Sequence, residues 1–301
     1  MSPTDQRISL NGKGGPRTAA APSAPVSPPG PVSTPGSPSP AGTADARPAR
    51  GPGAGPAIQI TGVSKTFGKG RSATVALDGV SLSVAPGEFV CLIGASGCGK
   101  STLLSLVAGL EAPTSGTVST GGRRVAFMFQ EPALFPWLTA AQNVALPLRA
   151  NGVGRKQRRE RVRDLLDSVH LGGFADKRPH ELSGGMRQRV ALARALAQDA
   201  DVLLMDEPFG ALDAMTRDLL HELLEGIWRR EGFSVLFVTH EVREAVRLGD
   251  RVVLLSSRPG RVLEDFDIGI ERPRGIDSGQ TVERALQIKA QLNEEVMRHV
   301  G

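Results

Sequence analysis

The chain has 301 residues, 40% of them hydrophobic, and its 36 Lys and Arg against 31 Asp and Glu give a net charge of +5. It contains no run of 18 apolar residues and no apolar centre of a signal peptide, so we expect a cytosolic protein without a bilayer span. Two cysteines are too few for a disulfide framework or a cysteine metal site. Residues 1–56 supply +3 of the charge, and the remainder is too small to indicate a nucleic-acid partner.

The first 56 residues differ in composition from the rest of the chain. They contain 13 of the 22 prolines and no aromatic residue, and Ala, Gly, Ser and Thr fill most other positions. Such a stretch has too little apolar surface to offset the entropy lost on ordering. We therefore predict a disordered tail over 1–56, serving as a linker or a dispensable extension, and a folded body that starts near Ile58.

A glycine-rich loop joins a predicted strand to a predicted helix. Residues 88–93 (EFVCLI) are apolar enough for a buried strand, and residues 100–108 have helical spacing. The loop between them, residues 94–101, is GASGCGKS. Its glycines allow positive φ and backbone N–H groups that face an anion at the positive end of the helix. Lys100 is then placed to reach β- and γ-phosphates and Ser101 to hold Mg²⁺ with its hydroxyl, whereas the alternative is a turn that merely contains these residues.

One cysteine precedes this loop and the other lies within it. Cys91 lies within the predicted strand, so we expect it in the core. Cys98 lies in the loop itself, where a small residue tolerated at a variable position is the favoured interpretation. The alternative for Cys98 is an oxidisable thiol beside the nucleotide.

A strand with two carboxylates at its end is predicted over residues 201–207 (DVLLMDE). Apolar strands of this kind suit the centre of a parallel sheet, whose carboxyl edge faces the ligand. We expect Asp206 to orient the Mg²⁺ shell and Glu207 to act as general base or to position the attacking water. The alternative is a strand that simply ends in charged residues.

Two further strands end in polar residues in the same way. Residues 234–239 (SVLFVT) precede His240, which is placed to reach a γ-phosphate. Residues 124–129 (RVAFMF) precede Gln130, whose amide is suited to bind Mg²⁺ or the attacking water. Alone, each of these side chains has a structural interpretation, and their combination with the loop favours catalysis.

The segment after Gln130 is rich in apolar side chains although prolines interrupt it. Residues 130–138 read QEPALFPWL, and their large apolar members are Leu134, Phe135, Trp137 and Leu138. An apolar loop indicates a partner surface, and burial in the protein's own core is the alternative. A basic helix is predicted over 155–163 (RKQRRERVR), where a solvated face is favoured over contact with anionic lipid or a partner.

A second anion-binding surface is predicted at residues 182–188 (LSGGMRQ). Ser183 is expected to cap a helix, and Gly184 and Gly185 leave its first N–H groups bare. One chain has little need of two such surfaces for one nucleotide. We therefore expect a homodimer in which this segment closes over the nucleotide held by the other subunit.

These motifs together resemble the ATP-binding subunits of ABC transporters, from about Ile58 to at least Val262. In that resemblance residues 94–101 are the Walker A loop, Gln130 the Q-loop glutamine, 182–188 the signature, Asp206 and Glu207 the end of Walker B, and His240 the switch histidine. It implies an α/β fold: a P-loop NTPase (RecA-like) core with an antiparallel β subdomain and a helical subdomain over about 131–181.

The resemblance also implies a set of residues that bind ATP and Mg²⁺. Phe67 takes the place of the aromatic residue that stacks on adenine, because the chain has no Tyr. Glu207, His240 and Gln130 are the expected catalytic residues, and Ser101, Gln130 and Asp206 the expected Mg²⁺ ligands. The remaining expected nucleotide contacts are Gly94, Ala95, Ser96, Gly97, Cys98, Gly99, Lys100, Ser101, Thr102, Ser183, Gly184, Gly185, Gln188 and Asp213. Asp213 closes the D-loop, GALD over 210–213.

Residues 130–138 and 257–262 (SRPGRV) are similar to the nitrate, sulfonate and taurine importers of that family. The resemblance implies a peripheral ATPase on the cytoplasmic face of the cell membrane, bound to two permease subunits and served indirectly by an extracytoplasmic solute-binding protein. Aliphatic sulfonate is the favoured solute, with taurine, nitrate or a thiamine-precursor pyrimidine as alternatives. A non-transport ABC ATPase or an inactive scaffold is disfavoured, because Lys100, Glu207 and His240 are present and only one short module occurs.

Two expectations concern the rest of the chain. The ATPase domain is expected over 57–270, followed by a C-terminal helical extension over 271–301. The Pro259-Gly260 step is expected to form a type II turn between strands at 252–255 and 261–266.

Overall fold

The computed structural model describes residues 55–300, without the side chains of Arg71, His299 and Val300. All but the last two positions of the predicted tail therefore lie outside the described residues. The first strand, β1, begins at Ile58.

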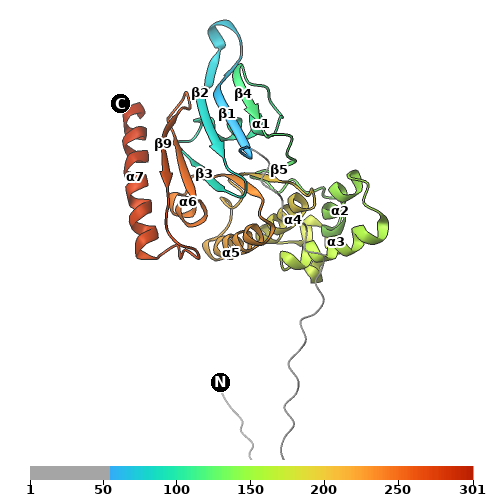
Figure 1. Ribbon diagram of the computed structural model, residues 1–301. Coiled ribbons are helices and arrows are strands. Elements are labelled where there is room, and N and C mark those ends of the chain that lie inside the picture. The colour runs from blue at the N-terminus through green and yellow to red at the C-terminus, as the bar shows by residue number, and fades with distance from the viewer. Residues whose placement is uncertain (1–54, 301) are drawn as a thin grey trace, which may run out of the picture. The chain divides into compact units, whose positions relative to one another are not determined.

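A six-stranded sheet forms the centre of the described body (Figure 1). Its strand order is β5-β6-β7-β3-β8-β9, and all neighbours are parallel except the antiparallel edge pair β8 and β9. The strands span β3 (Phe89–Ile93), β5 (Val125–Met128), β6 (Val202–Asp206), β7 (Ser234–Val238), β8 (Arg251–Leu255) and β9 (Val262–Asp267). Because β5, β6, β7 and β3 are parallel, the residues that follow them meet at one edge of the sheet.

A smaller antiparallel sheet lies against one face of this sheet. It has the order β2-β1-β4, from β1 (Ile58–Phe67), β2 (Thr74–Val84) and β4 (Ser115–Ser119). Its apolar side chains share a core with α1 (Lys100–Val107) and with one face of the six-stranded sheet. This places the phosphate loop, residues 94–101, between β3 and α1 at the border of the two sheets.

The central strands are apolar throughout because both of their faces are covered. Every residue of β3 and of β7 is buried. Alternate residues of β3 enter different cores: Cys91 and Ile93 pack toward the helices, and Val90 and Leu92 pack toward the smaller sheet. The prediction of a buried strand with Cys91 in the core is confirmed.

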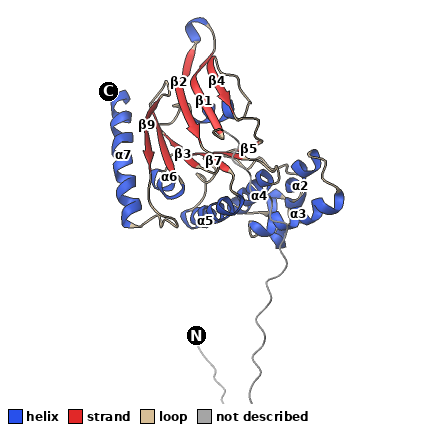
Figure 2. Ribbon diagram, in the orientation of Figure 1, coloured by secondary structure: helices blue, strands red, loops and turns tan. Residues whose placement is uncertain are grey.

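Helices cover the other face of the six-stranded sheet, as Figure 2 shows in blue. On that face lie α4 (Gly184–Leu196), α5 (Ala214–Glu231) and α6 (Val242–Leu248). The helices α2 (Ala140–Ala150) and α3 (Arg155–Ser168) pack against α4, and α7 (Gly279–Val300) packs against α6. Short 3-10 turns occur at η1 (Gly70–Ser72), η2 (Gly172–Phe174) and η3 (Pro179–Glu181). The helix expected over 155–163 is therefore present, and its basic side chains are largely exposed while Val162 packs inward.

The connection between β8 and β9 differs from the sequence prediction. A type II turn requires positive φ at its third residue, and Gly260 does not have it. Gly260 instead lies against the phosphate loop, where an added Cβ would be 2.1 Å from the carbonyl oxygen of Cys98. The type II prediction is therefore wrong, and close backbone approach is the reason for glycine at this position.

Among the helices of residues 55–300, none combines the length and the hydropathy that a bilayer span requires.

Candidate active site

The phosphate loop wraps the ammonium group of its own lysine. Lys100 is 6% exposed, and its Nζ donates to the carbonyl oxygens of Gly94 and Ala95 at 2.9 and 3.0 Å. Gly97 and Gly99 have φ of 77° and 100°, so the positive φ predicted for the loop is confirmed. A Cβ on Gly99 would be 2.8 Å from the Ala76 carbonyl oxygen, so only glycine fits where the loop enters α1.

Ser101 and Asp206 lie together at the carboxyl end of β6. Ser101 begins the helix after the loop, and its side chain hydrogen bonds to the Asp206 carboxylate. Burial raises the pKa of Asp206, the Ser101 hydrogen bond opposes that shift, and the neighbouring Glu207 carboxylate adds to it. A hydroxyl and a partly buried carboxylate in contact are the oxygen ligands that Mg²⁺ takes in proteins, so these two predicted ligands fit that ion.

Glu207 and His240 are in direct contact. His240 Nδ1 is 3.1 Å from Glu207 Oε2, although the two residues follow different strands, β6 and β7. Glu207 has φ of 43°, in the left-handed region that non-glycine residues rarely occupy, and such strain is typical of functional positions. The arrangement can hold a water between the carboxylate, the imidazole and a phosphate bound at the loop.

Gln130 is exposed at the end of β5, and the buried Gln188 side chain holds its backbone. Gln188 Nε2 donates to the Gln130 carbonyl oxygen at 2.9 Å, and Gln188 is 3% exposed. The Gln130 backbone is thus held by a side chain of α4. Gln188 acts within its own chain here, through Gln130, which the sequence did not predict.

The signature segment begins α4 as expected. Ser183 is the N-cap, and its side-chain oxygen accepts from the Met186 N–H at 3.2 Å. Gly185 is buried, and a Cβ there would be 2.4 Å from the Thr216 methyl group of α5. Gly185 therefore lets α4 and α5 pack closely.

Two other predicted nucleotide contacts lie at the ends of elements. Asp213 caps α5 by accepting from the Thr216 N–H at 3.0 Å, and that hydrogen bond lowers the pKa of Asp213. Phe67 ends β1 with its ring 42% exposed and the Lys65 Nζ 4.9 Å from the ring centroid. An exposed aromatic face of this kind is available for stacking on a base.

The loop between β8 and β9 forms a wall of the phosphate loop that the sequence did not predict. Arg258 Nε donates to the Gly97 carbonyl oxygen at 3.2 Å, and Gly260 N donates to the Ala76 carbonyl oxygen at 2.9 Å. On its other side, the Ser257 N–H donates to Glu295 of α7 at 2.9 Å. Residues 257–260 (SRPG) were interpreted from the sequence only as a mark of the importer subgroup. In the structure, Arg258 and Gly260 of this segment make the contacts with the phosphate loop and its neighbour Ala76.

The apolar loop after Gln130 is divided between surface and core. Phe135 is 41% exposed and Trp137 67% exposed, and their ring centroids are 5.5 Å apart. Leu134 is partly buried and packs against the helical core. Burial in the protein's own core therefore accounts for Leu134 but not for the two aromatic residues.

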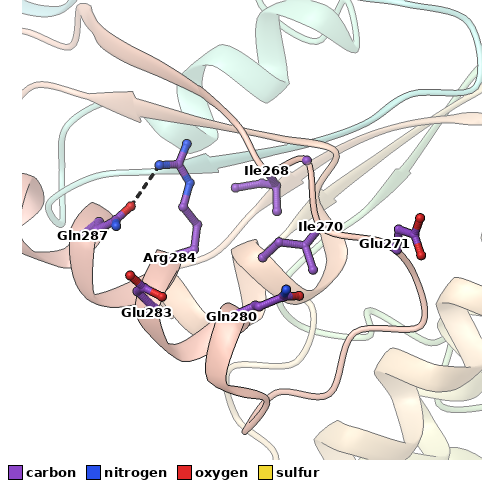
Figure 3. A pocket seen from close by; sticks show the side chains of 8 residues that line it. Ile268, Ile270, Glu271, Gln280, Glu283, Arg284 and Gln287 are labelled. Atoms are coloured by element: carbon purple, nitrogen blue, oxygen red, sulfur yellow. Dashed lines mark hydrogen bonds between the residues drawn. The ribbon is translucent and has the colours of Figure 1, made fainter.

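A cavity of about 430 Å³ lies apart from these residues in sequence, between the end of β9 and α7 (Figure 3). Arg284 in its wall donates to Gln287 Oε1 at 3.0 Å and to the Asp267 carbonyl oxygen at 2.8 Å. The wall contains none of the predicted site residues, and Arg284 is held by its neighbours. We therefore place the active site at the phosphate loop.

Comparison with known proteins shows the family of this chain. The family model described as ABC transporter matches residues 77–210. The taurine import ATP-binding protein TauB of Burkholderia pseudomallei is 49% identical over 247 residues, which cover 78% of this chain and 95% of that protein. The chain belongs to the ABC transporter ATP-binding family. The matched residues 77–210 include the phosphate loop at 94–101, the segment at 182–188 and strand β6.

Other relatives of this ABC ATPase carry different import names. The nitrate import ATP-binding protein NrtD of Synechocystis is 48% identical, covering 71% of this chain and 83% of that protein. The aliphatic sulfonates import ATP-binding protein SsuB of Burkholderia ambifaria is 47% identical, covering 83% of this chain and 73% of that protein. The resemblance to this importer subgroup is therefore confirmed.

Solved structures confirm the fold class of this ABC ATPase. A dimeric ATP-binding cassette in a post-hydrolysis state, bound to ADP and Pi, is 35% identical with a TM-score of 0.63, covering 72% of this chain and 99% of that chain. A second dimeric structure of a bacterial ABC transporter cassette is 36% identical with the same TM-score of 0.63 and the same coverage. The α/β P-loop core expected from the sequence is the fold of the family.

Proposed function

We propose that this chain is the ATP-hydrolysing subunit of an importer, and that its solute is an aliphatic sulfonate. Taurine, nitrate and a thiamine-precursor pyrimidine are the alternatives. One observation supports the catalytic role: five polar side chains from α1, β6 and the ends of β6 and β7 meet at one edge of the sheet. They are Lys100, Ser101, Asp206, Glu207 and His240, and Ser101 hydrogen bonds to Asp206 while His240 contacts Glu207.

Each residue has a role that follows from its position. Backbone N–H groups of residues 94–102 and the Lys100 ammonium hold the phosphates, and Phe67 stacks on adenine. Ser101, Asp206 and Gln130 would hold Mg²⁺, which supplies charge compensation at the phosphate oxygens. Glu207 accepts a hydrogen bond from the attacking water and so polarises it. His240 contacts Glu207 and positions it relative to the γ-phosphate.

Ser183, Gly184, Gly185 and Asp213 would complete the site from a second copy of this chain. The exposed N-terminus of α4 is an anion-binding surface with no acidic residue in its first turn. Dimeric solved relatives support this arrangement. ATP then closes the dimer and hydrolysis opens it, as a shift between two populations.

The partners outside the dimer are two permease subunits, which recruit the ATPase to the cytoplasmic face of the cell membrane. The exposed pair of Phe135 and Trp137 supports such a contact, because aromatic residues at protein surfaces are enriched in interfaces. An extracytoplasmic solute-binding protein would act indirectly through that permease, with no role for nucleic acid. We assign the ATPase domain to 57–270, its helical subdomain to about 131–181, and a helical extension to 271–301.

Steady-state ATP hydrolysis tests the catalytic assignment. Glu207→Gln removes the charge that polarises water, so turnover is expected to fall by about 100-fold or more while ATP binding persists. The matched control is Glu271→Gln, an exposed glutamate in the wall of the cavity near α7. Wild-type turnover by Glu207→Gln would refute the role of Glu207.

Growth after deletion of the gene tests the solute. We expect the deletion strain to lose growth when an alkanesulfonate is the sole sulfur source. It should grow normally when taurine is the sole sulfur source and when nitrate is the sole nitrogen source. Loss on taurine or nitrate instead would assign the alternative.

A further inference from the structure

A buried hydrogen-bonded network lies directly behind His240. Its members are Thr239, which is 2% exposed, Glu244 of α6, which is 5% exposed, and His221 of α5, which is 0% exposed. The Thr239 hydroxyl donates to Glu244 Oε2, and His221 Nε2 is 2.5 Å from Glu244 Oε1. Polar side chains this deeply buried destabilise the fold unless each donor and acceptor is paired, so the hydrogen-bond partners of these three residues matter for stability.

The pairing fixes where the protons lie. The Thr239 oxygen already accepts from the Glu241 N–H at 2.9 Å, so its single proton goes to Glu244. Arg247 donates toward His221 Nδ1 at 3.4 Å, which leaves His221 Nε2 as the donor to the other carboxylate oxygen. The two side-chain oxygens of Glu244 thus each accept one hydrogen bond, and Arg247 lies beside His221.

The network holds the backbone on both sides of His240. Thr239 precedes His240 and Glu241 follows it, and the Thr239 hydroxyl bonds the Glu241 N–H across that residue. The Thr239 N–H also donates to Leu92 of β3 at 3.2 Å. The His240 side chain itself is 59% exposed, so the surrounding side chains do little to hold it and its backbone must place it against Glu207.

The same network contacts the turn that follows Glu207. The Phe209 ring packs edge-on against His221, with centroids 5.6 Å apart. Asp218, one turn before His221 on α5, accepts from Arg247 at 3.0 Å. One buried cluster therefore touches the segments that carry both Glu207 and His240.

We propose that Thr239, Glu244 and His221 are positioning residues that hold His240 in hydrogen-bonding contact with Glu207. This inference rests on the proposed function, because it takes His240 and Glu207 as the hydrolytic pair. None of the three touches the nucleotide in this scheme, and they act through the backbone around His240.

The test compares kcat and the KM for ATP in paired variants. Thr239→Val keeps the side-chain shape but removes the hydroxyl, so we expect kcat to fall about 10-fold with KM changed less than about twofold. Thr239→Ser restores the hydroxyl and is expected to recover kcat to within about twofold of wild type. In the same way His221→Gln, which keeps an N–H donor, should retain more activity than His221→Leu.

A control separates positioning from general loss of stability. Ser234 is 2% exposed at the opposite end of β7, where its hydroxyl donates to Ala85 and accepts from the Gly87 N–H. Ser234→Ala should lower the thermal midpoint and leave kcat unchanged. Unchanged kcat in Thr239→Val, an equal loss in Thr239→Ser, or an equal loss in Ser234→Ala would overturn the proposal.

A second variant, Glu244→Gln, tests the proposal even if Thr239→Val folds poorly. Glu244→Gln is isosteric but has one acceptor oxygen for two donors, so it should also lower kcat about 10-fold. It should also shift the ring ¹⁵N resonances of His240, and unchanged resonances with unchanged kcat would overturn the proposal. If Glu207→Gln itself hydrolysed ATP normally, the proposed function would fail. If Glu207→Gln were inactive while the network variants were normal, only this inference would fail.

Discussion

Asp206, a proposed Mg²⁺ ligand, has a burial that disfavours its ionised form. Burial holds the pKa of its carboxyl above the ordinary value of about 3.9, so ionisation favours the unfolded chain. The stability from this group is fully present below the ordinary value and is lost as pH rises through the raised one. At neutral pH the ionised Asp206 carboxylate therefore disfavours folding, and a bound cation would compensate its charge.

Replacing that carboxylate makes a prediction at the residue scale. Asp206→Asn should raise the thermal midpoint of nucleotide-free protein at pH 7 by on the order of 2 °C, because the partly exposed charge is partly screened. The gain should shrink at pH 4, where the wild-type carboxyl takes up its proton. Thermal unfolding at both pH values checks this, and a gain of equal size at each would contradict it. ATP hydrolysis should be lost in the same variant.

Cys98 is predicted to be unreactive in the nucleotide-free protein. It is 1% exposed, and burial raises the pKa of its thiol although the Lys100 ammonium opposes that shift. Burial also raises the pKa of the Cys91 thiol. Both should react with a neutral maleimide at pH 7 only after denaturation, as followed by intact mass. Rapid labelling of the native protein would instead support the oxidisable-thiol interpretation of Cys98.

At the residue scale, the confirmed predictions lie within single motifs. Ser183 as N-cap and positive φ in the phosphate loop follow from local chemistry and are confirmed. Three other contacts join residues that are 23 to 58 positions apart in the chain. They are Glu207 with His240, Gln188 with Gln130, and His221 with Glu244. No local pattern specifies such pairs, because they depend on strand order in the sheet.

At the scale of elements, the loop between β8 and β9 provides a prediction about ATP affinity. In Gly260→Ala the new Cβ would be 2.1 Å from the Cys98 carbonyl oxygen, and because that neighbour is backbone, the phosphate loop must shift. We expect the KM for ATP to rise about 10-fold. Steady-state kinetics measures it, and an unchanged KM would contradict the close contact.

The matched control is a glycine with free space around it. Gly226 lies exposed within α5, and an added Cβ there meets nothing within 4 Å. Gly226→Ala should stabilise the protein by up to about 1 kcal/mol, because alanine loses less backbone entropy in a helix. It should leave the KM for ATP unchanged.

Most of the strands and helices could be predicted from pattern alone. Buried strands such as β3, β6 and β7 are continuous apolar runs, and α4 begins at a serine cap. The β8–β9 turn could not, because the glycine at 260 serves a packing contact with a distant segment rather than a turn conformation. A pattern of Pro followed by Gly does not distinguish these two uses.

At the scale of the whole molecule, the described chain has two helices, α1 and α4, whose N-terminal ends we propose to bind the nucleotide phosphates. Each begins with a glycine-rich segment, and at the α1 end that segment surrounds the Lys100 ammonium, which donates to two of its carbonyl oxygens. A dimer that joins the α1 end of one subunit to the α4 end of the other would use both. Such a site exists only when two copies meet, so hydrolysis should depend on dimerisation.

The molar mass of Glu207→Gln in solution tests this account most directly. With saturating Mg·ATP, light scattering should give twice the 31.7 kDa mass of one chain, and with Mg·ADP it should give the monomer mass. A protein that binds Mg·ATP yet keeps the mass of one chain at high concentration would contradict the shared site.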